Sequence, residues 1–510
     1  MWKWSCVPLR SIASTSQSGI TPRISSSSHS QVTMLQGRRR CAFNHCPTGL
    51  IMRRPKLARD TVWLASSDGL AIIFGLIGQV ILAKALLQSD YGLLVVILDA
   101  FATMYILIDA GLPTIIARDV PRSPGARRKA VRRVLKLQAL IAVPFLLGSA
   151  IVSTSIWDDA PLGLLIACAV VAFGHIMSYP HKAMLRALGE ARIESILKLI
   201  ERVITTGLYY LFLVNDYDSP TIYACGFSIG VLISLIGTLW IGERLARDGN
   251  DDLPQDWNSS KALLISALPF AVTLGILPYV TKLEKFLLAG LSSYDDVSLY
   301  HVAQLAWIAG LMLPQAMRAA LLPYLGEARD NPGKFSERML AAHHWTIAIL
   351  PVGLIAGHLI VSFSIPQFFD SNYADAVQVF DILLAGWAMT LLAIPWYVAL
   401  QAGHNPWRFT TLILLVVLAA GLSGWLLIPE YGVMGAAWAS VIGCSIMLSF
   451  SKLLCGDEER LSDGLALFSV AICYLLSIGS SLALIGLLTM IPAKNSIDFL
   501  RSQTGYLQEE

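Results

Sequence analysis

Long apolar runs recur along almost the whole chain, and they constrain its fold more than any other feature. A run of eighteen or more apolar residues predicts a helix that crosses a lipid bilayer. The composition agrees, because 55% of the residues are hydrophobic and only 14% are charged, whereas a soluble domain usually has about 25% charged residues. The chain is therefore predicted to be an all-α, polytopic membrane protein.

Pro, Gly and Asn–Asp clusters divide these runs into separate predicted helices. The predicted spans are 61–87, 91–117, 134–156, 161–182, 199–214, 221–242, 261–290, 297–322, 339–365, 374–402, 407–428, 433–454 and 464–491. The second helix of each half runs into the same tripeptide, Ala-Arg-Asp, at 117–119 and 328–330. Thirteen spans with this repeat predict two six-helix bundles around a central cavity, plus one C-terminal helix.

The predicted domain boundaries follow from these spans. The domains are a leader at 1–59, a first bundle at 60–243, a cytoplasmic linker at 244–260, a second bundle at 261–455, an extra helix within 456–491 and a tail at 492–510.

Basic residues are confined to alternate predicted loops, and this orients the helices. The loops at 118–136, 182–202, 242–261, 325–338, 403–408 and 452–463 hold 22 Lys and Arg, and the intervening loops up to the twelfth span hold none. Basic loops stay on the cytoplasmic side of a membrane. The protein is therefore predicted to lie in the plasma (inner) membrane with its N-terminus in the cytoplasm.

Residues 1–59 differ from the rest of the chain, with ten Lys and Arg, ten Ser and no Asp or Glu. Two interpretations stay open. This segment is an organellar transit peptide, or it is translated sequence upstream of a true start at Met52. Either way it is expected to be disordered and to carry no transport chemistry.

Several motifs follow one another in a fixed order through residues 56–455. The first half holds SDYGLLVVILDAF and LIDAGLPTIIARDVPR, and the second half holds SALPFAVTLGILPYVTKLEKFLLAG, PQAMRAALLPYLGEA and LIPEYGVMGAAWAS. In this order and spacing the chain resembles the polysaccharide and O-antigen flippase family of the multidrug/oligosaccharidyl-lipid/polysaccharide (MOP) exporter superfamily. Two departures are the count of thirteen helices, where twelve or fourteen are common, and Glu284-Lys285 where the family often has Asp followed by Arg or Lys.

The resemblance implies a MATE-like (MOP) fold and a transport function. The expected substrate is a polyprenol-(pyro)phosphate-linked sugar or oligosaccharide, which is moved to the outer leaflet for cell-surface polysaccharide such as the O-antigen of lipopolysaccharide. Expected partners are this lipid-linked glycan, membrane lipids and H⁺ or Na⁺ as coupling ion, with a polysaccharide polymerase as a candidate. The resemblance implies no covalent chemistry, no cofactor and no nucleic acid.

Charged side chains inside the predicted spans are candidate site residues, because a charge at the centre of a bilayer is costly and must face a cavity or a partner. Lys282 and Lys285 are three residues apart on one helix face, and Lys282 lies about 12 Å from the outer end at about 1.5 Å per residue. Lys282 is predicted to meet the substrate phosphate or a sugar acid; the alternative is a structural ion pair, with Asp381 as partner. Lys285 lines the cavity or reaches the interface as an anchor.

The remaining candidates are assigned by charge and depth. Glu284, Arg318 and Asp381 are predicted to line the cavity, although Arg318 lies near the inner end of its helix and could extend to the headgroups. Asp68 and Asp109 lie at similar depths on antiparallel helices, and two close carboxylates in a low dielectric share a proton or a cation. They are the coupling-ion candidates; the alternative is that each carboxylate accepts only local hydrogen bonds.

Other functional classes fit the sequence less well. The basic cavity residues disfavour a cation-coupled multidrug exporter of the same superfamily. A membrane glycosyltransferase usually needs a large extracytoplasmic loop, but the outer loops predicted here have eleven residues or fewer. Neither a GxxxxGK[ST] phosphate loop nor a HExxH metal motif is present, and the eight cysteines have no metal-ligand spacing, so no metal site is expected. A non-transporting scaffold is the remaining alternative.

The predicted topology is testable with single-cysteine labelling in intact cells and inverted vesicles. Residues 118–133 and 244–260 should react with an impermeant maleimide only from the cytoplasmic side, and residues 215–220 only from outside, because basic loops are retained in the cytoplasm. Labelling of Arg128→Cys from outside would contradict the helix count.

Overall fold

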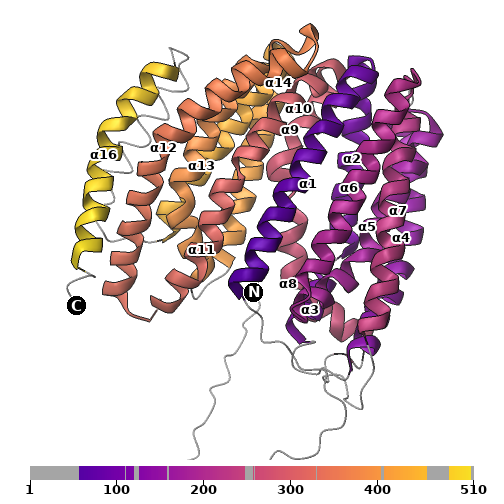
Figure 1. Ribbon diagram of the computed structural model, residues 1–510, viewed down its shortest axis with the longest axis horizontal. Coiled ribbons are helices and arrows are strands. Elements are labelled where there is room, and N and C mark those ends of the chain that lie inside the picture. Colours follow the sequence, from indigo (N-terminus) through magenta and orange to yellow (C-terminus); the bar gives the residue numbers. More distant parts are fainter. Residues whose placement is uncertain are drawn as a thin grey trace, which may run out of the picture. The chain divides into compact units, whose positions relative to one another are not determined.

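The computed structural model describes residues 57–109, 111–119, 126–157, 160–246, 257, 259–328, 330–403, 407–455 and 482–506, all within the compact unit Arg53–Glu510 (Figure 1). Every regular element among them is helical, so the all-α prediction is confirmed. Seven of the described helices are long and apolar enough to cross a membrane. The protein is therefore a multi-pass membrane protein.

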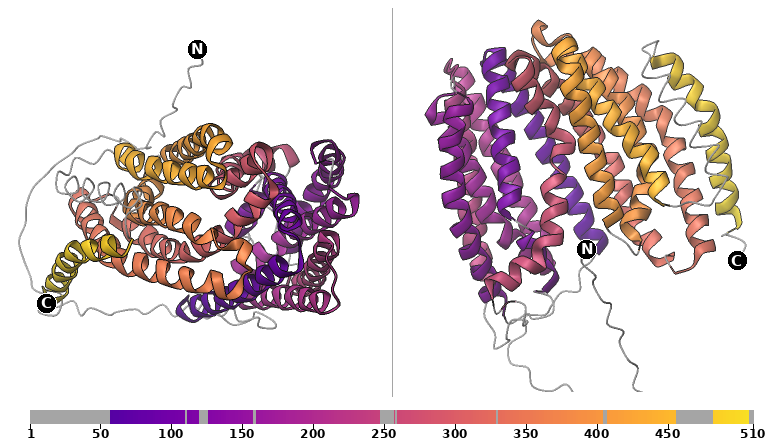
Figure 2. Two further views of the ribbon diagram at one scale, coloured as in Figure 1. Left: turned by 90° about the horizontal axis from the view of Figure 1, so that it is seen from above. Right: turned by 180° about the vertical axis from the view of Figure 1, so that it is seen from behind.

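The described helices follow the predicted order of two halves. The first half holds α1 (Leu57–Ala85), α2 (Gln88–Asp109), α3 (Leu112–Asp119), α4 (Arg127–Ile156), α5 (Leu162–Ala187), α6 (Ala191–Val214) and α7 (Pro220–Leu245). The second half holds α8 (Ser260–Ile276), α9 (Tyr279–Leu291), α10 (Tyr294–Gly310), α11 (Met312–Ala328), α12 (Pro332–Phe368), the 3₁₀ turn η3 (Ser371–Tyr373), α13 (Ala376–Ala402), α14 (Trp407–Cys455) and α16 (Leu482–Tyr506). In Figure 2 the helices coloured indigo to magenta and those coloured salmon to orange form two adjacent groups.

Three predicted spans are broken helices rather than continuous ones. The span 91–117 divides into α2 and α3 beside Gly111, whose φ of 70° lies in the left-handed region that favours glycine. The span 261–290 divides into α8 and α9 at Pro278, which cannot donate a helical hydrogen bond. The span 297–322 divides into α10 and α11 at Leu311. Conversely, the spans 407–428 and 433–454 are joined as α14 across a kink at Gly432, with φ 53°.

The end of the chain differs from its prediction. Helix α16 begins at Leu482 and continues through residues 492–506, which were predicted to be tail. Its polar end packs on α12, where the His344 ring stacks on Phe499 at 4.0 Å between centroids and His344 Nδ1 lies 3.0 Å from Ser496 Oγ. This tertiary contact stabilises helix beyond the apolar run. Residues 1–56 of the predicted leader and residues 464–481 of the last predicted span lie outside the described residues, whereas leader residues 57–59 begin α1.

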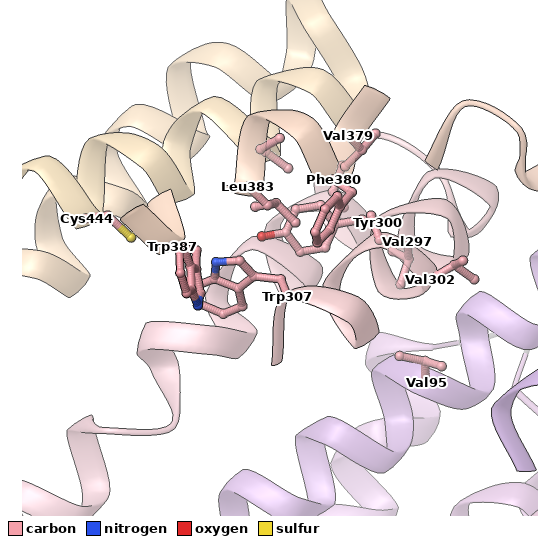
Figure 3. Packing of buried hydrophobic residues seen from close by; sticks show 14 of the residues in the cluster. Val95, Val297, Tyr300, Val302, Trp307, Val379, Phe380, Leu383, Trp387 and Cys444 are labelled. Carbon is pink, nitrogen blue, oxygen red and sulfur yellow. The ribbon is translucent and has the colours of Figure 1, made fainter. Parts of the chain in front are cut away.

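Helix α13 forms the centre of the second bundle. Its residues from Leu383 to Leu400 are all buried, as is typical of a helix that is apolar on every side. It packs against α10, α11, α12 and α14, and Figure 3 shows Phe380 and Trp387 of α13 near Tyr300 and Trp307 of α10. In the first bundle, α5 packs on α7 and α6 packs on α1. Apolar packing between helices therefore holds each bundle together, and one buried apolar cluster includes residues of both.

The two bundles meet most closely where α2 lies against α10 and α9. At Gly92 of α2 the approach is so close that a Cβ atom would overlap the carbonyl group of Tyr294. Gly92 therefore allows backbone-to-backbone contact between the halves.

Replacing Gly92 with leucine should separate α2 from α10 at this contact. Overpacking a close contact costs about 1–3 kcal/mol, so we expect a lower unfolding midpoint in detergent. Gly148→Leu is the control, since nothing lies within 4 Å of a Cβ built at Gly148. Equal midpoints for the two variants would contradict the close contact.

Candidate functional site

A polar cavity of about 730 Å³ opens among α1, α2, α5, α6 and α7 of the first bundle, and α10 of the second bundle contributes His301 to its lining. Its charged and polar lining consists of Gln79, Asp99, His175, Tyr179, Lys182, Arg186, Glu194, Ser195, Lys198, Glu201, Arg202 and His301. Charged residues are rare within membrane helices and mark ligand or ion pathways when they face a cavity. This cavity is therefore the candidate functional site.

Helical spacing places the basic side chains on one wall. Lys182 and Arg186 are four residues apart on α5, and Lys198 and Arg202 are four residues apart on α6, so each pair shares one helix face. Only residues 188–190 separate α5 from α6. The short turn keeps the two helices adjacent and brings the four cations to the same cavity.

These residues correct the sequence analysis, which assigned 182–202 to a cytoplasmic loop. Helix α5 continues beyond the end of its apolar run. A membrane helix can carry long basic side chains at its end, because they extend towards the headgroups or into a polar cavity. The spacing of the cations by four residues was the available signal, and it is typical of a helix face.

Acidic side chains partly neutralise this wall. Arg186 Nε lies 3.0 Å from Glu194 Oε2, and His175 Nε2 lies 4.0 Å from Glu201 Oε1. With Asp99, three acids and four Lys and Arg line the cavity, which gives a formal charge of +1 with histidine neutral. An anion in the cavity would therefore meet a positive field.

Two lysines of the second bundle reach the far end of this cavity through Asp99 of α2. Lys282 Nζ lies 3.0 Å from Asp99 Oδ1, and Lys285 Nζ forms an ion pair with Asp99 Oδ2. The side chains of Lys282 and Lys285 are 18% and 4% exposed. One carboxylate thus links α2 of the first bundle to two cations on α9 of the second.

A hydrogen-bonded chain surrounds this ion cluster. Lys285 Nζ lies 3.5 Å from His301 Nδ1, and His301 Nε2 lies 3.2 Å from Gln79 Oε1. A protonated lysine can only donate, so Nδ1 is the acceptor and Nε2 carries the hydrogen donated to Gln79. Tyr91 donates a second hydrogen bond to the same Gln79 oxygen, at 2.7 Å. The network therefore connects α1, α2, α9 and α10.

The structure brings Lys282 and Lys285 together as their spacing predicted, but it places Glu284 elsewhere. Glu284 is 1% exposed and lies near Tyr300 and Cys444 of the second bundle. Its Oε2 has no hydrogen-bond partner among the described residues. Lys282 and Lys285 contact Asp99 at the cavity, whereas Glu284 is on another face of α9.

The other predicted site residues lie apart from this cluster. Asp381 was the expected partner if Lys282 formed an ion pair, and that pairing is wrong: Asp381 Oδ1 lies 2.8 Å from His358 Nδ1, and Asp99 is the partner of Lys282. Arg318 Nε donates to Gln401 Oε1 at 3.1 Å, between α11 and α13. The described lining of the polar cavity includes neither residue.

The two coupling-ion candidates, Asp68 and Asp109, fall within α1 and at the end of α2. Their side chains lie outside the part of the chain that the structure describes, so their pairing stays a prediction.

Known proteins share both sequence and fold with this chain. A family model described as "Polysaccharide biosynthesis protein" matches residues 57–329, more than half of the chain. No curated protein sequence matches. The fold is similar to the lipid II flippase MurJ in an inward closed conformation, with 13% identity and a TM-score of 0.64 over 88% of this chain and 100% of that one.

Two transporters of the MOP superfamily have a similar fold. One is an inward-facing multidrug resistance MATE transporter, with 14% identity and a TM-score of 0.61 over 80% of this chain and 96% of that one. The other, from Pyrococcus furiosus, has 15% identity and a TM-score of 0.55 over 82% and 96%, and its binding pocket is described as reversed in polarity. The predicted MOP fold is therefore confirmed.

Removing the carboxylate of Asp99 should destabilise the protein. In Asp99→Asn the buried Lys285 loses its counter-ion, and breaking such a pair costs about 3–5 kcal/mol. We expect a lower unfolding midpoint in detergent, with much of the loss recovered in Asp99→Asn/Lys285→Met, which removes the most buried ion pair and leaves only the more exposed Lys282 without its counter-ion. Asp295→Asn, at an exposed position, is the control. An unchanged midpoint in Asp99→Asn would show that the cluster contributes nothing to stability.

Proposed function

Because the chain belongs to the polysaccharide biosynthesis protein family, we propose that it moves a polyprenol-(pyro)phosphate-linked sugar or oligosaccharide from the cytoplasmic to the outer leaflet. The observation that carries this proposal is the positively charged cavity inside a membrane-spanning bundle. Such a cavity offers an anionic headgroup a route through the membrane that the hydrocarbon does not.

The electrostatics of the cavity favour an anion with polar substituents. A phosphate that leaves water loses favourable hydration, and positioned ammonium and guanidinium groups replace part of it through charge-assisted hydrogen bonds. Lys182, Lys198 and Arg202 line the cavity, and Tyr179 and Ser195 add hydroxyl groups suited to a sugar. The volume of about 730 Å³ lies within the usual range for small-molecule sites, about 300–1,000 Å³.

The proposed cycle follows the two-bundle architecture. The turn between α5 and α6 belongs to the basic, cytoplasmic side of the predicted topology, in an inner membrane with the N-terminus in the cytoplasm. The headgroup enters there, meets the α5 and α6 cations and reaches Lys282 and Lys285. Rearrangement of one bundle against the other then gives access to the outer leaflet. Asp68 and Asp109 stay candidates for binding a coupling H⁺ or Na⁺, and a polysaccharide polymerase stays a candidate partner.

A cation-coupled drug exporter is the second candidate function, since a multidrug resistance transporter shares the fold. Such a protein would have to hold a cationic drug, whereas the four Lys and Arg of the cavity repel one. The substrate charge therefore separates the two functions.

Purified protein in liposomes provides the test. The probes are a fluorescent polyprenyl-diphosphate-linked N-acetylglucosamine, whose outer-leaflet fraction is read by dithionite quenching, and ethidium as a drug cation. We expect protein-dependent flipping of the lipid-linked sugar and no ethidium transport. Ethidium transport without flipping would refute the proposal in favour of the exporter.

Lys282 should be needed for flipping more than for folding. Loss of one charge-assisted hydrogen bond is worth about 1.5–3 kcal/mol, so Lys282→Ala should reduce the flipping rate by about tenfold or more. Asp99 keeps Lys285 as its counter-ion, and protein levels should hold. Lys282→Arg should retain partial activity, and Lys282→Glu should be worse than alanine.

Lys261→Ala, an exposed lysine at the start of α8, is the matched control. Full activity in Lys282→Ala would exclude a role in substrate binding. Activity regained only in the charge swap Lys282→Asp/Asp99→Lys would assign Lys282 to a structural ion pair instead.

A further inference from the structure

A smaller cavity, of about 380 Å³, lies where α2, the end of α4, α9 and the start of α10 meet. We call it the outer pocket. Four aromatic residues line it: Trp157, Tyr279, Phe286 and Tyr294. Trp157 follows α4 and Tyr294 begins α10, so this end of the pocket lies on the outer side of the predicted topology.

Helix α2 separates the outer pocket from the polar cavity. Val95 and Asp99 line the polar cavity, and the residues that follow each of them, Val96 and Ala100, line the outer pocket. Successive residues of a helix point about 100° apart, since one turn holds about 3.6 residues, so the two cavities lie on different faces of α2. The ion pairs that Asp99 forms with α9 therefore join the two helices at the boundary between the cavities. The path proposed for the headgroup ends at this boundary.

The outer pocket differs from the polar cavity in charge. None of its described lining residues is charged, so a phosphate would find no counter-charge there. Aromatic rings with a few polar atoms suit a neutral sugar instead, because the C–H face of a pyranose packs on a ring while its hydroxyl groups form hydrogen bonds. The two cavities therefore fit different parts of a glycosylated phosphate.

Unused polar atoms lie on the wall of the outer pocket. Neither the indole N–H of Trp157 nor the hydroxyl of Tyr279 has a hydrogen-bond partner among the residues that the structure describes. The hydroxyl of Thr103 donates to the carbonyl of Asp99 at 2.8 Å and keeps lone pairs that can accept from a ligand. The pocket thus combines stacking surfaces with donors and an acceptor.

Tyr279 lies too deep to belong to an ordinary aromatic belt. It begins α9, twelve residues before the outer end of that helix at Leu291, which is roughly 18 Å at about 1.5 Å per residue. Belt residues lie at the level of the headgroups. The Tyr279 ring packs edge-on against Phe286, with 6.5 Å between centroids. A polar ligand in the pocket would give its hydroxyl the partner that hydrocarbon does not.

We propose that the outer pocket binds a sugar ring of the lipid-linked glycan while the phosphate lies at Lys282. This inference rests on the proposed function. The phosphate and its sugar are covalently joined, so a phosphate at the Asp99–Lys282 pair places the sugar beside α2 and α9, whose next turns line the pocket. The volume is near the lower end of the usual range for ligand sites, about 300–1,000 Å³. It therefore suits a short part of the glycan rather than the whole.

A lipid-linked sugar with a photoreactive group on the sugar tests this proposal with the full-length protein. The probe is polyprenyl-diphosphate-linked N-acetylglucosamine whose N-acyl group carries a diazirine, in vesicles of neutral phospholipid. After irradiation, crosslinked peptides are mapped by mass spectrometry. We expect residue 157 and residues 279–290 to be labelled at least about fivefold more than the exposed face of α14 around Trp425, and unlabelled lipid-linked N-acetylglucosamine should compete.

A second probe, in which a straight alkyl chain carries the diazirine in place of the sugar, separates a sugar site from a hydrocarbon site. It has the same diphosphate and the same polyprenyl chain. We expect it to label the outer pocket several-fold less than the sugar probe does, because an alkyl chain cannot bond to Trp157 and Tyr279.

Two variants address the pocket wall. Trp157→Leu removes a stacking surface but keeps an apolar side chain, and it should reduce labelling of residues 279–290 about fivefold. Tyr279→Phe keeps the ring and removes only the hydroxyl, so folding is retained, and loss of one hydrogen bond should reduce labelling about threefold. Trp425→Leu, at a position of α14 that is 61% exposed, is the matched control and should not change it.

The outcomes separate the sugar site from the transport function. Equal labelling of the pocket by the alkyl probe, or unchanged labelling in both Trp157→Leu and Tyr279→Phe, would overturn the sugar site. Normal flipping without labelling of the pocket would overturn it as well and leave the proposed function standing. Pocket labelling that falls in both variants, in a protein that flips nothing, would refute the proposed function and leave the sugar site standing.

Discussion

The ion cluster of Asp99, Lys282 and Lys285 is the interaction on which the rest of the molecule depends. Charges inside a membrane helix are tolerated when they are paired or face water, and this cluster does both, since Asp99 also lines the polar cavity. The carboxylate comes from the first bundle and both ammonium groups come from the second. Burial of charge therefore fixes how α2 and α9 meet, and Gly92 allows the adjacent close approach of α2 to α10.

Broken helices bring these groups to one place. Pro278 ends α8 and lets α9 begin with its own direction, so the two lysines reach Asp99 while Glu284 lies within the second bundle. From α9 the polar network continues through His301 and Gln79 to Tyr91. The same two helices, α1 and α10, also carry Val80 and Val302, which line a second, apolar cavity. Polar and apolar compartments are thus separated by single-residue steps along two helices.

Fold-level features were predictable from sequence because they depend on local composition. Apolar runs, breakers and basic loops identified the helices and the two halves, and lysine spacing identified the shared face of Lys282 and Lys285. The pairing with Asp99 was not predictable, since 183 residues separate Asp99 from Lys282 and only tertiary packing selects it over Asp381. The positions of Lys198 and Arg202 on a helix were missed for another reason. Apolar residues identify only the part of a helix that faces hydrocarbon. The turns of α6 that face the cavity are polar, so they were predicted to be a loop.

The stoichiometry of the ion cluster has a consequence for anion binding under the proposed function. Two lysines share one carboxylate, so the cluster keeps a formal charge of +1 with Asp99 ionised. A phosphate at the end of the cavity therefore meets residual positive charge and does not need to displace Asp99 completely. Each hydrogen bond that the phosphate accepts from Lys282 nevertheless leaves fewer hydrogen-bond donors for Asp99, because an ammonium has only three donors. A ligand shifts a conformational equilibrium only through its differential affinity for the two states. At Asp99 the headgroup and the contact between the bundles use the same two lysines, so headgroup binding can change that contact.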